Sequence, residues 1–234
     1  LRTLQKQTID SDIHHHDTAA TLPELPIFLV ANEFFDALPV RQYVRDADGW
    51  RERVVGLVDG ALAFGLADVS HPPVLDSRLQ DTIEGDLVEI CPSASAIMRD
   101  IDARISQSGG VAFILDYGDW RSLGDTLQAI HGHKSQAPLA EPGAADLTTH
   151  VDFEALSDAA TKTRSSRLCP QGVFLERLGI TERARALAQN MTGKALEQHI
   201  AAHRRLTHPD EMGTLFKVMT LSPTEAPLPP GMTT

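Results

Sequence analysis

The sequence contains few cysteines, few aromatic residues and no long hydrophobic run. Its 234 residues include two cysteines, Cys91 and Cys169, which lie far apart and outside any C-x-x-C spacing. We therefore expect reduced thiols rather than a disulfide framework or a zinc site. No apolar stretch approaches 18 residues, so we expect no membrane-spanning helix. Apolar residues make up 42% of the chain and charged residues 23%, which is typical of a globular domain of ordinary size.

Basic residues are also scarce. The chain has 21 lysines and arginines against 32 acidic residues, which gives a formal net charge of −11. Proteins that bind nucleic acid depend on lysine and arginine contacts to phosphate, so this balance argues against that class. An acidic surface suits a basic protein or peptide partner, although it also serves solubility alone. We predict a protein partner, with no nucleic acid and no membrane.

Several catalytic motifs are missing. The sequence has no G-x-S-x-G, no phosphate-binding P-loop and no G-x-G-x-x-G. Neither cysteine has an obvious histidine partner, so a nucleophilic mechanism has no candidate residue. These absences argue against a hydrolase and against a nucleotide-binding oxidoreductase.

The apolar segments that are present alternate with helical patterns. Residues 27–31 and 111–115 are short continuous apolar runs, typical of strands buried on both faces of a parallel sheet. Between them, residues 51–67 predict a β-hairpin around Asp59-Gly60, and residues 93–107 predict an amphipathic helix. Residues 1–25 are polar and predict a solvated loop. Helix followed by apolar strand indicates an α/β fold.

Polar clusters follow the two apolar strands. Asn32 and Glu33, with Asp36 nearby, follow the first strand, and Asp116-Tyr117-Gly118 follows the second. Ligands of open α/β sheets bind outside the carboxyl ends of the strands, so both clusters lie where a ligand is expected. The alternative is that these residues only cap helices and close turns. The spacing alone leaves both interpretations open.

A third polar cluster includes Asp146, His150 and Asp152. These side chains look superficially like a metal-binding set, but their spacing matches no metal motif, and Asp152 is placed to cap a following helix. We therefore predict no metal site.

Several long motifs, in fixed order, resemble the MidA-like family of mitochondrial complex I assembly factors. Residues 30–42 (VANEFFDALPVRQ) closely resemble the NEFFDALP motif of that family, and Leu115–Gly118 is similar to its DYG strand end. Further similarity lies in W-x-E-R at 50–53, in residues 125–134 and 142–153 (PGAADLTTHVDF), and in the closing motifs at 174–180 and 212–218. The similarity extends over residues 1–221.

The resemblance implies a Rossmann-like methyltransferase fold of class α/β that uses S-adenosyl-L-methionine. It implies a methyltransferase domain over 1–221 with the β-hairpin insertion at 51–67, extra helices in a largely helical acceptor-side region over 120–206, and a Pro-rich tail over 222–234. In the family, the Gly-rich loop that binds the cofactor precedes a Leu-Arg pair, and that pair corresponds to Leu1-Arg2 in this sequence. We therefore expect the domain to be incomplete at its N-terminus and strand 27–31 to have an unpaired edge.

The resemblance also implies methylation of arginine on a protein such as a respiratory complex I subunit. We predict that Glu33 and Asp36 grip the guanidinium and that Asn32 orients it. Predicted cofactor contacts are Ala31, Asn32 and Glu33. Predicted substrate contacts are Phe35, Leu38, Pro39, Asp116, Tyr117, Asp146, His150 and Asp152.

Two other functions remain open at this stage. A non-catalytic partner-binding or assembly module would use the acidic strand ends to hold a basic segment, and no methyl donor would be needed. A different α/β enzyme is the second alternative. We expect the bacterial cytoplasm as the compartment, with the mitochondrial matrix as the alternative, and we consider a homodimer as an assembly state.

Overall fold

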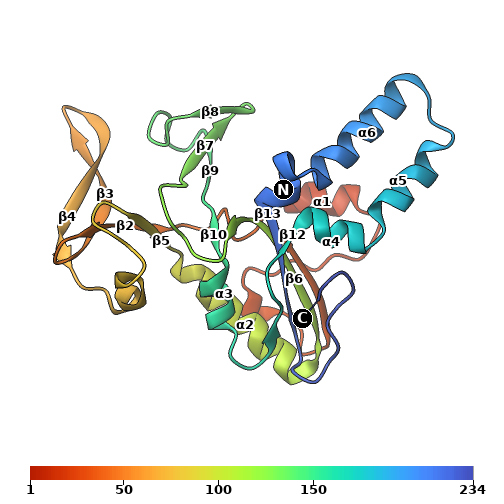
Figure 1. Cartoon of the computed structure of the whole chain (residues 1–234), viewed down its shortest axis with the longest axis horizontal. Coiled ribbons are helices and arrows are strands. Elements are labelled where there is room, and N and C mark those ends of the chain that lie inside the picture. The colour runs from red at the N-terminus through yellow and green to blue at the C-terminus, as the bar shows by residue number, and fades with distance from the viewer. Residues whose placement is uncertain (234) are drawn as a thin grey trace.

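The computed structural model describes residues 1–233, and its centre is a mixed β-sheet (Figure 1). Strand β1 (Ile27–Asn32) runs parallel to β6 (Gly110–Asp119), and β13 (Phe216–Ser222) runs antiparallel to β6. The short strands β11 (Arg164–Ser165) and β12 (Cys169–Pro170) pair with β13, and β10 (Val151–Asp152) extends along the end of β6. The two apolar runs seen in the sequence are therefore parallel neighbours, as predicted.

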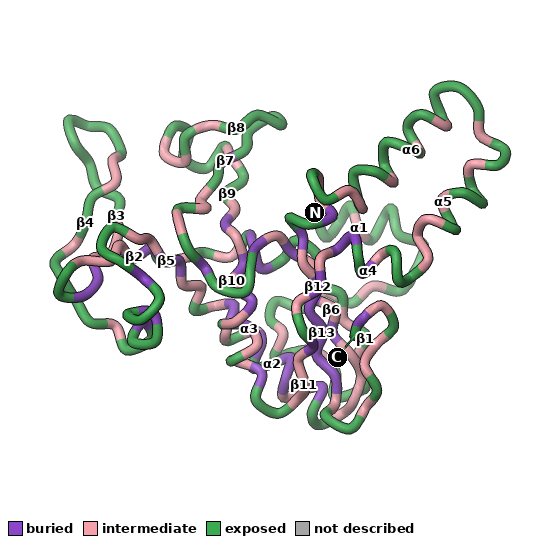
Figure 2. Tube along the Cα trace, viewed as in Figure 1, coloured by how far each residue is buried: buried purple, intermediate pink, exposed green. Residues whose placement is uncertain are grey.

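Helices α2 (Pro92–Ser108) and α3 (Phe153–Ala159) pack together beside this sheet. The helical periodicity of residues 93–107 is confirmed, because Met98, Ile101 and Ile105 are buried along one side of α2. Gly109 ends the helix at a φ of 81°, and its N–H donates to the carbonyl of Ile105. The main core combines this helix pair with the sheet, and its fully enclosed members include Ile114, Phe153, Leu156, Met219 and Leu221 (Figure 2).

Strand β1 differs from the expectation of burial on both faces. It lies at the edge of the sheet with β6 as its neighbour, and its residues alternate between partly buried and exposed. The side chains of Phe28 and Val30 are 87% and 70% exposed. The expected unpaired edge of this strand is therefore present in the part of the chain that the structure describes.

A four-stranded antiparallel sheet is inserted between β1 and α2. Its order is β4-β3-β2-β5, formed by β2 (Arg41–Asp46), β3 (Gly49–Val58), β4 (Ala61–Ser70) and β5 (Leu87–Ile90). The predicted hairpin is confirmed as β3 and β4, joined at Asp59-Gly60, where both residues have positive φ. Near the short helix η2 (Pro73–Leu79), a small core forms around Trp50, Tyr43, Leu75 and Val88. The hairpin extends beyond that core (Figure 1).

The prediction of a largely helical region over 120–206 is wrong for its first third. Strands β7 (Gln128–His131), β8 (Lys134–Gln136) and β9 (Asp146–Thr148) form a separate antiparallel sheet of order β8-β7-β9. Strands of three or four residues are too short to show an alternating pattern, which is why the sequence did not reveal them. The region after β9 holds α3 and the short strands β10, β11 and β12, and it is mostly helical from residue 171 on, with α4 (Gln171–Arg177), α5 (Ile180–Ala188) and α6 (Gly193–Thr207).

The two ends of the chain are more ordered than their composition suggests. The predicted loop over 1–25 contains a helix, α1 (Arg2–Thr8), and a helical turn, η1 (Ala19–Thr21). Near the C-terminus, the turn η3 (Pro209–Gly213) leads into β13. The Pro-rich tail is a loop, as expected, but Leu228 and Met232 pack in a cluster with Phe174.

Candidate active site

The carboxyl ends of β1 and β6 meet at one edge of the main sheet. Asn32 pairs with Leu115 in the parallel register, and the N–H of Glu33 donates to the carbonyl of Leu115 at 2.9 Å. The polar clusters that follow the two strands are therefore neighbours, as the sequence predicted. The loop after β1 then folds back over the end of β6.

Asp116 holds this loop in place. Its side chain has no exposed surface, and its Oδ2 accepts hydrogen bonds from the N–H groups of Phe34, Phe35 and Asp36 at 3.2, 3.0 and 3.3 Å. Its Oδ1 accepts the N–H of Tyr117 at 3.0 Å. Burial, followed by the negative charge of Asp36, raises the pKa of Asp116 to about 7, although the N–H groups favour the ionised form. Asp116 was predicted to contact substrate, but it presents no surface for that contact.

Asp36 and Tyr117 form a buried pair beside Asp116. The hydroxyl of Tyr117 donates a hydrogen bond to Oδ2 of Asp36, and Asp36 is 5% exposed. Burial and this hydrogen bond raise the pKa of Tyr117 above its usual range. The other oxygen of Asp36, Oδ1, is buried and has no hydrogen-bond partner among the described residues. A buried acceptor without a partner is unusual and marks a place where a ligand donor would be stabilised.

Glu33 and Asn32 lie on the open side of the same loop. Both side chains are exposed, and the amide of Asn32 donates to Oε1 of Glu33 at 3.3 Å. Glu33 has a φ of 47°, a conformation that residues other than glycine adopt rarely and often at functional sites. The carboxylates of Glu33 and Asp36, which were predicted to grip a guanidinium together, point in different directions. Glu33 faces solvent and Asp36 faces the interior.

The remaining predicted residues of this loop divide between core and surface. Ala31 and Phe35 are 8% and 2% exposed and belong to the main hydrophobic core. Leu38 is partly buried against that core, and Pro39 is exposed. Only Leu38 and Pro39 therefore offer side-chain surface for the predicted substrate contact.

The third cluster does not act as one unit. Asp146 is exposed on β9. Asp152 caps α3 by accepting the N–H of Ala155 at 2.9 Å, as predicted, and it also accepts the N–H of Ser122 at 2.9 Å. Burial raises the pKa of Asp152. Within residues 1–233, no group of three or more His, Cys, Asp or Glu side chains is arranged to hold a metal ion.

His150 is the member of that cluster that reaches the strand ends. Its ring packs edge-on against the ring of Tyr117, with 5.6 Å between ring centroids. Tyr117 makes a similar contact with Phe216 on its neighbouring strand at 5.3 Å. Burial lowers the pKa of His150, so the neutral imidazole is favoured near pH 7. His150 thus supports the Tyr117–Asp36 pair without adding positive charge.

Sequence reasoning missed a buried polar network behind His150. Glu89 on β5 is 3% exposed, and its Oε1 accepts the side-chain amide of Gln42 at 2.8 Å and the N–H of Thr126 at 3.2 Å. The hydroxyl of Thr126 donates to Oε2 of Glu89 and accepts the N–H of His150 at 2.8 Å. This network connects the inserted sheet to the strand-end site. It joins residues far apart in the chain, so no local pattern could have revealed it.

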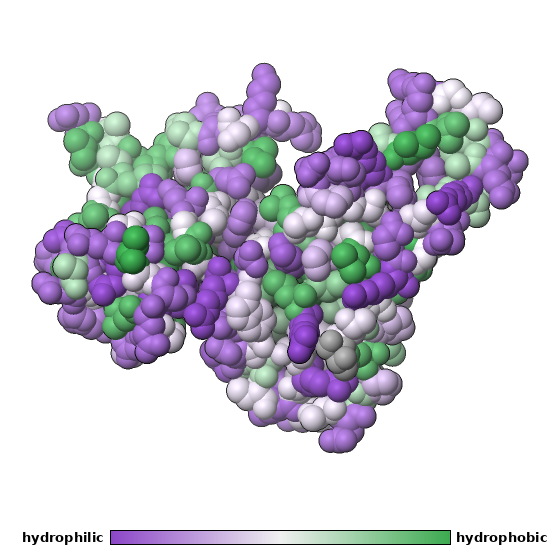
Figure 3. Space-filling view, in the orientation of Figure 1, coloured by the Kyte–Doolittle hydropathy of each residue, from purple (hydrophilic) through white to green (hydrophobic). Residues whose placement is uncertain are grey.

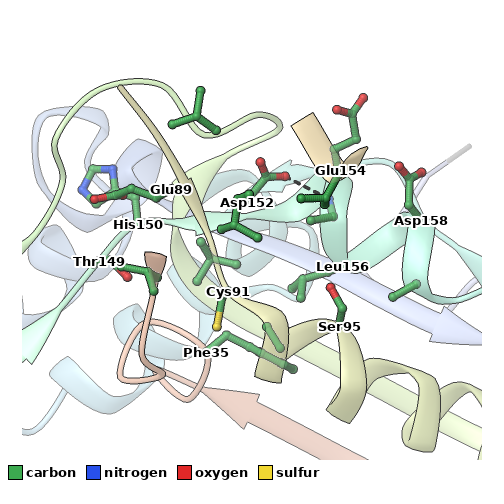
Figure 4. A pocket seen from close by; sticks show the side chains of 18 of the residues that line it. Phe35, Glu89, Cys91, Ser95, Thr149, His150, Asp152, Glu154, Leu156 and Asp158 are labelled. Atoms are coloured by element: carbon green, nitrogen blue, oxygen red, sulfur yellow. Dashed lines mark hydrogen bonds between the residues drawn. The ribbon is translucent and has the colours of Figure 1, made fainter. Parts of the chain in front are cut away.

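A cavity of about 320 Å³ lies next to these residues (Figure 4). Its walls come from β5, the beginning of α2, α3 and the segment before α3. The cavity shares Phe35, Thr149, His150 and Asp152 with the surroundings of the strand ends. Apolar side chains and a few polar groups line it together, a combination typical of ligand pockets.

Comparison with known proteins identifies the family. Residues 1–170 match a family model described as "putative S-adenosyl-L-methionine-dependent methyltransferase". The chain is 35% identical over 202 residues to the mitochondrial protein arginine methyltransferase NDUFAF7 of Xenopus laevis, and the match covers 84% of this chain and 46% of that protein. The NDUFAF7 of Danio rerio is 32% identical over 240 residues, covering 93% and 56%. The chain thus spans about half the length of the curated relatives it matches.

Solved structures agree with this assignment. A Burkholderia thailandensis protein bound to S-adenosyl-homocysteine superimposes with a TM-score of 0.73 at 29% identity, covering 94% of this chain and 59% of that one. A second solved structure from the same organism gives a TM-score of 0.73 at 31% identity, covering 86% of this chain and 57% of that one. Among the described residues, no helix is long and apolar enough to cross a membrane. The chain belongs to the family of S-adenosyl-L-methionine-dependent methyltransferases and has its Rossmann-like α/β fold.

Proposed function

We propose that residues 1–221 form the methyltransferase domain, without its Gly-rich cofactor loop, of an enzyme that transfers methyl groups to arginine on a protein partner. One observation carries this proposal: the exposed carboxylate of Glu33 lies at the sheet edge beside buried Asp36, whose Oδ2 accepts the hydroxyl of Tyr117 and whose Oδ1 has no partner among the described residues. The names of the relatives, protein arginine methyltransferases, support the choice of arginine. The family resemblance supports a complex I subunit as the acceptor protein.

The residues at the carboxyl end of β1 are placed to contact one side of the bound methyl donor. Asn32 and Glu33 are exposed at the carboxyl end of a parallel strand, the usual position for ligands of open α/β sheets. The side chain of Asn32 and the backbone of Glu33 would hold the donor, which leaves the carboxylate of Glu33 for the acceptor. The side chain of Ala31 packs in the core, so any contact from Ala31 would come from its backbone. When bound, S-adenosylmethionine supplies a methyl group on a positively charged sulfur.

Glu33 has the chemistry to bind the acceptor arginine. A guanidinium stays protonated in proteins, and a carboxylate can accept two parallel hydrogen bonds from it. This contact would draw positive charge toward the bound nitrogens and leave the far nitrogen more nucleophilic. Asn32, through its hydrogen bond to Oε1 of Glu33, would fix the direction of the carboxylate. Positioning and electrostatics of this kind account for much of the rate in such transfers.

Asp36 would add a second, interior acceptor. Its Oδ2 is occupied by the hydroxyl of Tyr117, and its buried Oδ1 would accept a donor from the ligand once the loop after β1 moves to admit it. The neutral His150 behind Tyr117 avoids repulsion of a bound cation. The net charge of −11 over the whole chain also favours a basic partner. For the compartment we retain the bacterial cytoplasm, while the named relatives are mitochondrial.

The test is a methyl-transfer assay with methyl-tritiated S-adenosylmethionine and purified complex I subunits, followed by amino-acid analysis for methylarginine. In a protein that transfers methyl groups, Glu33→Gln should lower kcat by about 10²–10³, the usual cost of one preorganised charge-stabilising group. Its affinity for S-adenosyl-homocysteine should stay nearly unchanged. Glu84→Gln, an exposed substitution in another loop, is the matched control and should behave as wild type.

Two results would contradict the assignment. If Glu33→Gln lost cofactor affinity and transfer equally, Glu33 would be a cofactor ligand only. If it lost neither, the exposed carboxylate would have no part in the reaction. Tight binding of a basic partner with no methylarginine under any condition would favour the partner-binding module instead.

A further inference from the structure

The β3–β4 hairpin exposes an apolar face. In the antiparallel register, Val55 pairs with Phe64, Leu57 with Leu62, and Arg53 with Leu66, so the side chains of each pair lie on the same side. The exposed fractions of Val55, Leu57, Leu62 and Leu66 are 52%, 73%, 39% and 48%. We call Val55, Leu57, Leu62, Phe64 and Leu66 the hairpin face. Figure 3 shows hydrophobic side chains gathered at this hairpin, at the upper left.

Strand β4 is also an open sheet edge. It is the outermost strand in the order β4-β3-β2-β5, so its outward backbone groups have no strand neighbour in the described chain. It is ten residues long, and its sequence, ALAFGLADVS, contains one charged residue and no proline or lysine. Natural edge strands are usually protected by charge, proline or bulges against pairing with another chain. The stretch from Ala61 to Leu66 has none of these protections.

We propose that β4 pairs antiparallel with β4 of a second copy of this chain across a two-fold axis. A strand paired with itself by such an axis is necessarily antiparallel, which continues the pattern of this sheet. With Phe64 opposite Phe64 of the second copy, Leu62 falls opposite Leu66 on the hairpin face. On the other side of the sheet, Ala63 falls opposite Gly65. This register places large side chains against large ones and small against small.

Charge favours this surface for self-association. Two copies with a net charge of −11 each repel one another. Residues 49–70 carry Arg51 and Arg53 against Glu52, Asp59 and Asp68, so little of the net charge lies on the hairpin. Asp68 lies at the bulge of β4 and beyond the paired residues 61–67, so no carboxylate falls opposite another. Two copies can therefore approach here with the least repulsion.

The other open edge, β1, is less suited to a second copy. Phe28 and Val30 are strongly exposed there, but β1 has only six residues and ends at Asn32, so a second copy paired along it would crowd the strand end where the proposed ligand site lies. The two edges therefore make different predictions, which single substitutions can separate.

The size of the contact sets its strength. In this register residues 61–67 pair with the same residues of the second copy, over a length of about 23 Å, and one edge contact about 10 Å deep covers roughly 230 Å² per partner. Stable interfaces bury about 800 Å² per partner. We therefore expect a weak dimer, with a dissociation constant on the order of 10–100 µM.

Sedimentation velocity of the full chain between about 5 and 500 µM tests the proposal, because this range brackets the expected constant. We expect a reversible monomer–dimer equilibrium that strengthens as sodium chloride is raised, since salt screens the mutual repulsion. Leu62→Lys should weaken dimerisation at least about tenfold, because the two-fold axis places two lysines on the apolar face. Leu66→Lys, on the same strand at a more exposed position and opposite Leu62 of the second copy, should weaken it as well and gives a second variant with little risk to folding.

Phe28→Lys is the matched control, because it makes the same kind of change on the other open edge. It should leave the dimer intact. A chain that stays monomeric up to about 500 µM, at either salt concentration, would overturn the proposal. So would association that Phe28→Lys abolishes and Leu62→Lys does not. None of these readouts depends on methyl transfer, so the proposal and the proposed function can fail separately.

Discussion

Replacing Asp116 by asparagine tests how the strand-end loop is held. The carboxylate of Asp116 accepts four backbone N–H groups while lying fully buried beside Asp36. Burial and the Asp36 charge raise its pKa to about 7 in the folded protein, against about 3.9 for an aspartate in an unfolded chain. The folded state therefore holds a proton that the unfolded state has already released between these two values.

The sign of the pH effect follows from this difference. Because the folded pKa is raised, the stabilising contribution is complete below about pH 4 and is lost as pH rises through about 7. The full difference corresponds to about 4 kcal/mol, of which about 2–3 kcal/mol falls between pH 5 and pH 8. Asparagine cannot ionise, so this pH dependence disappears in Asp116→Asn. The variant also loses an acceptor, because its amide NH₂ replaces one of the two carboxylate oxygens.

Urea unfolding followed by tryptophan fluorescence gives the comparison. The free energy of unfolding of Asp116→Asn, relative to that of wild type, should increase by about 2–3 kcal/mol from pH 5 to pH 8, because wild type loses stability over this range and the variant does not. Asp119→Asn, at an exposed position on the same strand, is the control and should show no such trend. A difference that is constant with pH would refute the raised pKa. A difference of opposite sign would show that the N–H groups outweigh burial.

Two further substitutions test the geometry of the site. Tyr117→Phe removes the hydroxyl that donates to Asp36 and leaves a buried carboxyl group without a donor. It should therefore lower the free energy of unfolding by about 1–3 kcal/mol. An unchanged urea midpoint would argue against this hydrogen bond. Gly118→Ala should destabilise the chain more strongly, because a Cβ at this position would lie 2.2 Å from the carbonyl oxygen of Val151 and separate β10 from β6. Gly124→Ala is the control for positive φ, because a Cβ there meets nothing within 4 Å. Equal effects of the two substitutions would contradict the close contact at Gly118.

The sequence was sufficient for elements that have short-range signals. The apolar runs at 27–31 and 111–115, the Asp59-Gly60 turn and the isoleucine spacing of α2 each predicted the correct element, because a continuous run, a turn pair and a helical repeat are local patterns. The sequence also predicted that the ends of β1 and β6 lie next to each other, since parallel strands place their carboxyl ends at one edge of a sheet.

Other features depend on distant partners, and sequence reasoning missed them. Burial of β1 was overestimated, because the exposure of Phe28 depends on which strands lie beside it. The polarity of residues 2–8 predicts a loop, but this segment forms helix α1 because Arg, Leu, Gln and Lys are good helix formers even where no residue is buried. The inward direction of Asp36 and the Glu89–Thr126–His150 network both depend on tertiary contacts between distant segments.

Calorimetric titration with S-adenosyl-homocysteine tests the central proposal most directly. The titration should be run on this chain, on Asn32→Ala, and on an extended form of the protein that matches its relatives in length. We expect the extended protein to bind and Asn32→Ala, introduced into it, to weaken that binding. Absence of binding by every form, with each form folded by circular dichroism, would contradict the proposal that the edge formed by β1 and β6 serves methyl transfer.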